Sequence, residues 1–295
     1  MRRRALFLIN KHSRHGADNA TACHDLLVQR GFELIDADCK KGSDWNSVIR
    51  EHHQNIDLVI IGGGDGTVNC ALDALAEMKL PLGIIPLGTA NDLARTLQIP
   101  ASIKTACDII AKGQTRKIDL GRVNGKYFMN VSSMGLSVSI TRALDKKTKK
   151  RWGVFAYFVA AFKVLLNSRP FIATIRSDTE EVKVRTLQIA VGNGRYYGGG
   201  MLVAQDAAID DDRLDLYSLE VDKWWQMIPM LIAMRRGEHD SLKRVRNLSS
   251  KHFVITSPKP HSINTDGEIT SKTPAHYEVV AKALTIYCDL DQTPS

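Results

Sequence analysis

The stretch from residue 58 to residue 69 restricts the possible fold of this chain more than any other. It is a short apolar run, Leu-Val-Ile-Ile, followed at once by Gly-Gly-Gly-Asp-Gly-Thr-Val-Asn. β-Branched residues in an unbroken apolar run are typical of a strand that is buried on both faces of a parallel sheet. Thr67 and Asn69 then open a helical pattern, which predicts a helix over 68–79. The stretch therefore predicts a strand, a tight loop and a helix.

The glycine loop offers backbone amides to a negatively charged ligand. Four glycines within five positions allow unusual backbone angles, and without Cβ atoms they let amides approach a phosphate closely. A helix that begins here also favours negative charge at its first turn. These properties suit a nucleotide; the alternative is a plain glycine turn in which Asp65 caps the helix. A carboxylate among such amides is expected to hold a magnesium ion, a water molecule or the loop itself.

Neither of the two common nucleotide motifs is present. Walker A requires Gly-Lys-Ser/Thr after its loop, and the dinucleotide motif requires Gly-x-Gly-x-x-Gly. Gly-Gly-Asp-Gly-Thr instead resembles the nucleotide loop shared by diacylglycerol kinases, sphingosine kinases, NAD kinases and phosphofructokinases.

A second polar turn follows the next predicted strand and reads Pro-Leu-Gly-Thr-Ala-Asn-Asp-Leu-Ala-Arg over residues 86–95. Loops after neighbouring parallel strands lie side by side, so Thr89, Asn91 and Asp92 should converge with the glycine loop and bind a phosphate, a ribose or a metal. The alternative is that Thr89 or Asn91 caps the next helix. With the first motif at this distance, the turn resembles bacterial lipid kinases of the diacylglycerol kinase catalytic family. NAD kinases share only the first motif.

The resemblance runs over essentially the whole chain, whose pattern changes near residue 118. Before it, strand and helix patterns alternate, which predicts a doubly wound parallel sheet. After it, an Asn-Gly hairpin signal and strand patterns at 171–177, 181–192, 213–219, 251–256 and 277–281 predict antiparallel pairing. We expect an α/β nucleotide-binding domain over 1–117 and a larger, mainly antiparallel β-sandwich domain for the lipid over 118–282. A last strand is expected over 283–288, and the C-terminal residues 283–295 could pack back on the first domain.

Two helical patterns interrupt the second domain, at 153–166 and 223–235. The first follows the basic run Lys-Lys-Thr-Lys-Lys-Arg-Trp at 146–152, and this combination has the composition of a membrane-surface anchor. A solvated charge run before a packed helix is the alternative.

The net charge of +8 suits nucleotide phosphates, anionic lipid surfaces or nucleic acid. No nucleic-acid motif is present, so we expect no nucleic-acid partner. No run of about 20 apolar residues exists, so no membrane span is expected. We expect a cytoplasmic protein that associates peripherally with anionic membranes. The sequence leaves open whether it forms a homodimer.

An acidic turn, Asp-Asp-Asp at residues 210–212, precedes a predicted strand. Adjacent carboxylates repel one another unless they are exposed or neutralised, so the turn is either an exposed loop or a cation site. In the resembling lipid kinases such a turn holds magnesium. By position, the resemblance gives the Asp211 carboxylate and the backbone carbonyls of Ala208 and Arg213 as ligands, with Asp212 in place of the usual glycine.

The resemblance also implies the function. Its third signature is Asp-Gly-Glu at 266–268, in which Glu268 is the proposed general base; by composition alone this is a turn. We expect an ATP- and Mg²⁺-dependent kinase that phosphorylates a hydroxyl of a membrane lipid such as diacylglycerol or phosphatidylglycerol, with Asp65 and Glu268 catalytic. A soluble NAD kinase-like enzyme and a non-catalytic lipid or nucleotide sensor are the alternatives. The expected nucleotide contacts are Gly63, Gly64, Asp65, Gly66, Thr67, Val68, Asn69, Thr89, Asn91, Asp92 and Asp38.

Overall fold

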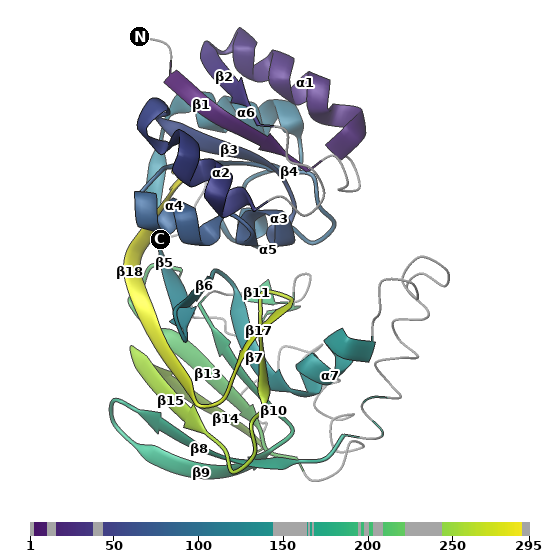
Figure 1. Cartoon of the computed structure of the whole chain (residues 1–295), viewed down its shortest axis with the longest axis vertical. Helices are drawn as coiled ribbons and strands as arrows, with labels where there is room; N and C mark the ends of the chain where they lie inside the picture. Colours follow the sequence, from purple (N-terminus) through teal and green to yellow (C-terminus); the bar gives the residue numbers. More distant parts are fainter. Residues whose placement is uncertain are drawn as a thin grey trace.

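The chain forms two lobes, which Figure 1 shows one above the other. The structure is a computed structural model and describes residues 3–10, 16–37, 44–143, 164, 166, 168–193, 196–197, 201–202, 209–221 and 244–290. The upper lobe in this view holds the parallel strands with helices around them, and the lower lobe is built mainly of strands.

The first lobe alternates strands and helices. Its parallel strands pair in the order β2-β1-β3-β4, and the register places Leu6 beside both Ile35 and Val59. This arrangement confirms the predicted doubly wound α/β fold. The elements are β1 (Arg3–Ile9), α1 (Gly16–Gln29), β2 (Phe32–Asp36), α2 (Trp45–His52), η1 (His53–Asn55), β3 (Leu58–Gly63), α3 (Asp65–Asn69), α4 (Leu72–Met78), β4 (Leu82–Pro86), α5 (Asp92–Thr96) and α6 (Ile103–Lys112).

Both faces of this sheet are buried, as the unbroken apolar runs predict. Successive side chains of a strand point to opposite faces, so Ile60 packs in one core with α1 and α6, and Ile61 packs in another with α2 and α4. Every residue of β3 is buried. The sheet edge where β3 and β4 end is therefore fixed by core packing on both sides.

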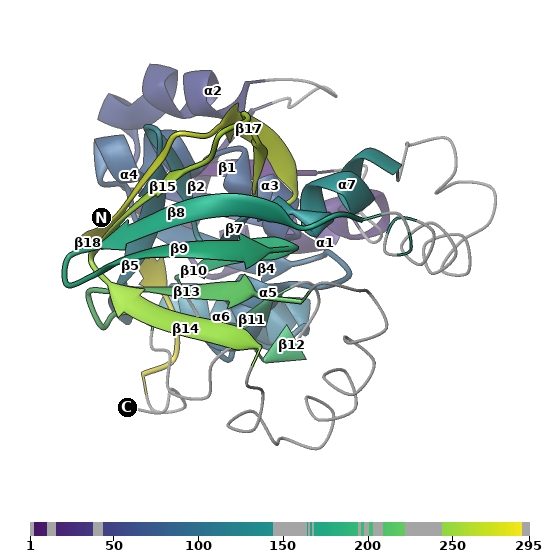
Figure 2. The same ribbon diagram turned by 90° about the horizontal axis from the view of Figure 1, so that it is seen from below.

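The second lobe is antiparallel. A six-stranded sheet runs β14-β13-β10-β7-β16-β17 and faces strands β15, β8 and β9 across an apolar core (Figure 2). This confirms the predicted β domain. The elements are β5 (Thr115–Val123), β6 (Lys126–Phe128), β7 (Val131–Gly135), α7 (Leu136–Ala143), β8 (Phe171–Ser177), β9 (Glu181–Thr186), β10 (Gln188–Gly192), β11 (Tyr196–Tyr197), β12 (Met201–Leu202), β13 (Leu214–Leu219), β14 (Val245–Ser250), β15 (His252–Thr256), β16 (Ser262–Thr265), β17 (Glu268–Lys272) and β18 (Ala275–Tyr287).

One long strand connects the lobes. β18 pairs with β15 of the second lobe through residues 275–278 and with β4 of the first lobe at Ile286 and Leu82, so a single sheet extends through both lobes. The sequence suggested two separate strands, at 277–281 and 283–288. They are joined through an irregularity at Lys282, which has a φ of 52°. Because β18 belongs to both lobes, the division at residue 117 stays a prediction.

Four further expectations need correction or fall outside the described residues. The helix expected over 68–79 is two short helices, α3 and α4, and the strand expected over 181–192 is two strands in different sheets. The helical segment expected at 223–235 and nearly all of that at 153–166 lie outside the described residues. Within the part of the chain that the structure describes, no helix is long and apolar enough to cross a membrane.

Candidate active site

The glycine loop lies where β3 ends and α3 begins. Gly64 is the N-cap of α3, with a φ of −105°. None of Gly62, Gly63, Gly64 and Gly66 has a positive φ, so the expectation of unusual backbone angles was wrong. The glycines are needed for space instead: a Cβ on Gly63 would lie 2.6 Å from the Cβ of Thr67. The loop is therefore a close-packed backbone surface rather than a strained one.

The second loop packs directly on the first. A Cβ on Gly88 would lie 2.4 Å from the Cα of Gly64, so only glycine fits between the two loops. Asn91 closes its own turn, because its Oδ1 accepts from the Gly88 amide and its Nδ2 donates to the Gly88 carbonyl, both at 3.1 Å. Asn91 has a φ of 53° and stands at the N-cap of α5 without a side-chain capping bond.

Asp65 ties the two loops together. Its carboxylate accepts hydrogen bonds from the backbone amides of Asp92, at 3.0 Å, and Leu93, at 3.1 Å. Of the three roles expected for Asp65, the hydrogen bonds of the structure correspond to holding the loop. Thr67 is fixed in a similar way, since the Nδ2 of Asn10 donates to its hydroxyl at 3.0 Å.

The remaining predicted nucleotide residues divide into buried and exposed. Val68, Asn69 and Asp92 are buried, and the Oδ1 of Asn69 has no hydrogen-bond partner among the described residues. Thr89 is exposed and lines a cavity of about 640 Å³ together with Gly88 and Asn91. The apolar side of this cavity comes from α5 and α6, and the cavity volume is in the range of ligand pockets. Asp38 lies outside the described residues.

The Asp-Gly-Glu turn joins β16 to β17. Asp266 and Gly267 both have a positive φ, of 47° and 96°. The Asp266 carboxylate accepts from the amides of Met129, Asn130 and Val131, at 2.8, 3.1 and 3.0 Å. These bonds fasten the turn to the start of β7. Burial nevertheless raises the pKa of Asp266 to about 6, and the negative charge of Asp65 contributes to the rise.

The turn faces the glycine loop across the two lobes. Figure 1 shows α3 and α5 on the side of the upper lobe toward the lower lobe, with β17 on the side of the lower lobe toward them. Burial raises the pKa of the Cys70 thiol at the end of α3, and the charge of Glu268 raises it further. Glu268 is exposed, and no described residue forms a hydrogen bond or ion pair with its carboxylate. Its charge thus acts at the C-terminal end of α3, the helix that follows the glycine loop, while its side chain stays available.

An ion pair beside this site also connects the lobes. The ammonium of Lys126 on β6 lies 2.6 Å from the Asp73 carboxylate on α4. The backbone amide of Tyr127 donates to the same carboxylate at 3.3 Å. The contact is half-buried on both sides, so it fixes β6 against α4 and with it the approach of the two loops.

The acidic turn is neutralised by basic side chains. Each aspartate has its own ion pair, Asp210 with Arg116, Asp211 with Arg213, and Asp212 with Lys251. Asp212 has a φ of 58°, in the region that glycine favours, which agrees with its place in the motif. Ala208 lies outside the described residues, and those residues contain no group of three His, Cys, Asp or Glu side chains that could hold a metal. The predicted ligand set consists of one carboxylate and two backbone carbonyls, so the magnesium site at this turn stays a prediction.

Two buried polar residues near the site were not anticipated. Asp119 accepts from the amides of Asp212 and Lys282, both at 2.7 Å, so it connects β5, the acidic turn and β18. Asn193 donates to the carbonyls of Asp119 and Met129. A lone acid inside the apolar run Ile-Asp-Leu at 118–120 was the sequence signal for Asp119, because a buried carboxylate requires partners.

Comparison with known proteins agrees with this geometry. Residues 4–123 match the diacylglycerol kinase catalytic domain, and residues 130–288 match the YegS C-terminal NAD kinase beta sandwich-like domain. The chain is 30% identical to a diacylglycerol kinase of Staphylococcus saprophyticus over 94% of this chain and 92% of that protein. It is also 30% identical to one of Staphylococcus aureus, over 82% of this chain and 78% of the relative. A crystal structure of a diacylglycerol kinase from Bacillus anthracis superimposes with a TM-score of 0.80 at 25% identity, covering 98% of both chains.

Proposed function

This chain belongs to the diacylglycerol kinase catalytic family and is a lipid kinase that uses ATP, and we propose that it transfers the γ-phosphate of ATP to the hydroxyl of diacylglycerol or phosphatidylglycerol. One observation carries the proposal. The Glu268 carboxylate, exposed and without a partner among the described residues, lies close enough to α3 to act on Cys70 at the helix end. An acceptor hydroxyl between the lobes would therefore meet both motifs.

The glycine loop and the second loop would hold ATP. The first turn of α3 favours negative charge, and the exposed Gly66, with open space where a Cβ would lie, leaves room for phosphates at the backbone. The exposed Thr89 hydroxyl would contact the nucleotide from the second loop, beside the cavity of about 640 Å³. The hydrogen bonds of Asp65 would keep the two loops at the spacing that this contact requires.

Glu268 would accept the proton of the lipid hydroxyl. Phosphoryl transfer needs positioning and charge stabilisation more than covalent help from the protein, so one base beside the hydroxyl is sufficient. The base must lie within about 3 Å of that oxygen. The hydrogen bonds of Asp266 to three backbone amides hold the turn still and thereby orient Glu268.

Magnesium would accompany ATP. The Asp65 carboxylate lies in the first turn of α3, where the phosphates are expected, and an oxygen ligand of this kind suits Mg²⁺. The ion would neutralise part of the phosphate charge when bound. Incubation of the full chain with ATP and Mg²⁺, in one sample with total membrane lipid and in a parallel sample with NAD, followed by mass spectrometry, tests the proposal. A new phosphorylated lipid is expected; phosphorylated NAD without a new phospholipid would contradict it.

The enzyme would work at an anionic membrane surface through the basic run at 146–152, which lies outside the described residues. Each basic residue near such a surface contributes about 1 kcal/mol, so replacing the four lysines at 146, 147, 149 and 150 by glutamine should weaken sedimentation with phosphatidylglycerol vesicles strongly. Unchanged sedimentation would move the contact elsewhere. Analytical ultracentrifugation of the same samples would test the homodimer.

A further inference from the structure

Glu268 and the glycine loop belong to different lobes, so the contacts between the lobes set the distance between them. Two paired strands, β5 and β18, connect the lobes, and Figure 1 shows β18 along one side of the molecule. Their pairing shifts between Val280 and Leu284, where Lys282 has a φ of 52°. An irregularity of this kind bends a strand and interrupts its hydrogen bonds. The angle between the lobes therefore also depends on contacts outside these two strands.

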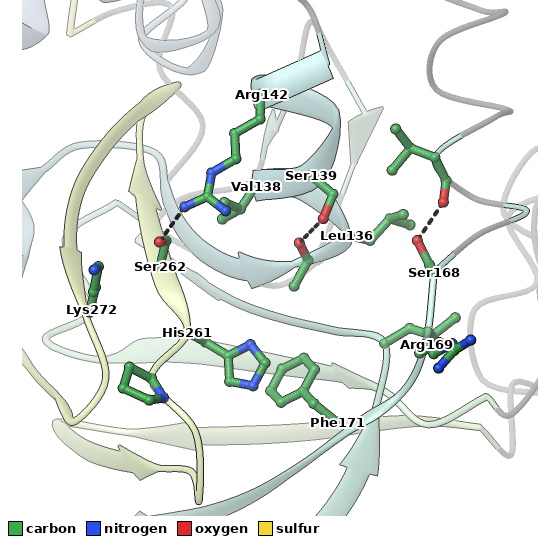
Figure 3. Close-up of a pocket in the computed structure, with 14 residues that line it drawn as sticks. Leu136, Val138, Ser139, Arg142, Ser168, Arg169, Phe171, His261, Ser262 and Lys272 are labelled. Carbon is green, nitrogen blue, oxygen red and sulfur yellow. Dashed lines mark hydrogen bonds between the residues drawn. The ribbon is translucent and has the colours of Figure 1, made fainter.

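The Asp-Gly-Glu turn is fastened within its own lobe on two sides. Its aspartate accepts three backbone amides at the start of β7. On the other side, the Nδ2 of Asn264 donates to the Thr141 hydroxyl of α7 at 3.1 Å, and its Oδ1 accepts from the Gly267 amide at 2.9 Å. Figure 3 shows Arg142 of α7 reaching to Ser262 at the start of β16, where the guanidinium donates to the hydroxyl at 2.6 Å. The glutamate of the turn therefore moves with the second lobe as a whole.

Asp73 of the first lobe contacts the second lobe with both of its carboxylate oxygens. It lies in the first turn of α4, the helix that follows α3. Its Oδ2 lies 2.6 Å from the Lys126 ammonium, and its Oδ1 accepts from the Tyr127 amide at 3.3 Å. Both partners belong to β6. Because each oxygen has its own partner, the contact fixes the direction of β6 as well as its distance from α4.

The strand β6 connects this contact to the Asp-Gly-Glu turn. Tyr127 packs against the core of the first lobe, and Phe128 is buried in the core of the second. Met129 is again buried in the first core, and its backbone amide donates to the aspartate of the turn at 2.8 Å. Residues 126–129 thus contact α4 at one end and the turn at the other. A shift of α4 against β6 would move the turn relative to the glycine loop.

The ion pair and Glu268 both act on the end of α3. Burial raises the pKa of the Cys70 thiol at that end, the charge of Glu268 raises it further, and the charge of Lys126 lowers it. The side chains of Lys126 and Asp73 are 29% and 19% exposed. The pair is therefore partly shielded from water, and its attraction is screened less than that of a surface pair.

We propose that Asp73 and Lys126 are positioning residues for phosphoryl transfer, which set the distance between the Glu268 carboxylate and the phosphates bound at the glycine loop. The inference rests on the proposed function, because it takes Glu268 as the base. The two residues act through β6 and the Asp-Gly-Glu turn rather than on the reacting atoms. A displacement of about 1 Å at the reacting atoms costs about 100-fold in rate. Loss of the pair should therefore slow the transfer step and leave ATP binding, which the first lobe provides, unchanged.

Kinetics of two variants test the proposal. Asp73→Asn removes the negative charge but keeps an oxygen for the Tyr127 amide, and Lys126→Gln removes the cation. Each should lower kcat for lipid phosphorylation about 10- to 100-fold, with the KM for ATP at the parental value. The double variant should lose no more than either single variant, because both remove the same contact. Lys126→Arg keeps the positive charge and should retain most of the turnover.

Glu77 provides the matched control. It lies on the same helix, α4, and pairs with Arg50 of α2 at 2.8 Å, so both partners belong to the first lobe. Glu77→Gln should therefore leave kcat at the parental value. An equal loss of kcat in this control, or a parental kcat in Asp73→Asn, would overturn the proposal.

Hydrogen exchange measures the connection between the lobes without turnover. In Asp73→Asn and Lys126→Gln, the amides of residues 129–131, which donate to the turn, should exchange several-fold faster than in the parent and in Glu77→Gln. Unchanged exchange at these amides would overturn the proposal. A parent that phosphorylates no lipid would contradict the proposed function, whereas faster exchange at 129–131 would still support the ion pair as the contact that positions the turn.

Discussion

The two acidic glycine turns that face each other across the lobes use the same residue types in different ways. Gly64 of the glycine loop and Gly88 of the second loop provide room for close contact and have no positive φ. In the Asp-Gly-Glu turn, Gly267 has a φ of 96° and open space around it. The first turn needs glycine because the neighbouring loop leaves no room for a Cβ, whereas the second needs glycine for its positive φ.

The aspartates of the two turns, in contrast, act alike. Asp65 accepts two backbone amides of the neighbouring loop, and Asp266 accepts three at the start of β7. Each ties its turn to a segment distant in sequence. Glu268 has no such role among the described residues, so the one acid that holds no backbone is the one free for proton transfer.

The largest expected effect is at Glu268. Glu268→Gln keeps the size of the side chain but cannot accept a proton, so turnover should fall about 100- to 10,000-fold. Its affinity for ATP and its melting temperature should stay at the parental values, because the side chain is exposed. Steady-state kinetics and calorimetry measure both, with Glu181→Gln on β9 as the control. Near-parental turnover would contradict the role of Glu268 as the base, and with it the contrast between a catalytic Glu268 and the two structural aspartates.

The next effect is a pH dependence at Asp266. Its pKa in the folded chain is about 6, against an ordinary value of 3.8. The folded state therefore binds this proton more tightly than the unfolded state. This tighter proton binding contributes about 3 kcal/mol to the free energy of unfolding. The contribution is fully present below about pH 4 and is lost as pH rises through about 6.

Urea unfolding of the wild type and Asp266→Asn measures this, because the variant cannot titrate. Between pH 4 and pH 8 the difference in free energy of unfolding should move by about 3 kcal/mol in favour of the variant. A movement in the opposite direction would mean that the three amides dominate over burial.

A smaller effect is expected at Asp65, and unlike that at Glu268 it should combine stability with activity. Asp65→Asn replaces an acceptor oxygen by NH₂, so one amide of Asp92 or Leu93 loses its partner. The free energy of unfolding should fall by about 1–3 kcal/mol, with a loss of ATP affinity as the loops separate. Asp57→Asn, which also loses a bond to a backbone amide, is the control. Parental stability with lost turnover would assign Asp65 to catalysis alone.

The smallest effect is the difference between two glycine substitutions. Gly88→Ala forces a Cβ against the Gly64 backbone and should cost about 1–3 kcal/mol. Gly267→Ala meets only the penalty of its positive φ, about 1–2 kcal/mol. Only Gly88→Ala should weaken ATP binding, which calorimetry would detect. Equal losses of ATP affinity would show that the two turns do not differ in the way their glycines suggest.

Much of the first lobe could be predicted because its signals are local. The apolar runs of β1, β3 and β4 and the glycines that end β3 are contiguous in sequence, so periodicity was sufficient. The second lobe was harder. Residues 181–192 look like one strand because both halves have strand composition, but the chain passes at Leu187 from one sheet to the other. The Thr186 hydroxyl donates there to the carbonyls of Gln188 and Leu219.

The sequence by itself determined the glycine loop, the fold class and the three motifs, because each depends on neighbours along the chain. Tertiary structure decided which acid is available. Asp65, Asp119 and Asp266 are engaged by amides 27 to 163 positions away, and Asp210 and Asp212 by cations brought from other segments. Hydrogen bonds and ion pairs form between groups that are close in space, so no local pattern could separate the structural carboxylates from Glu268.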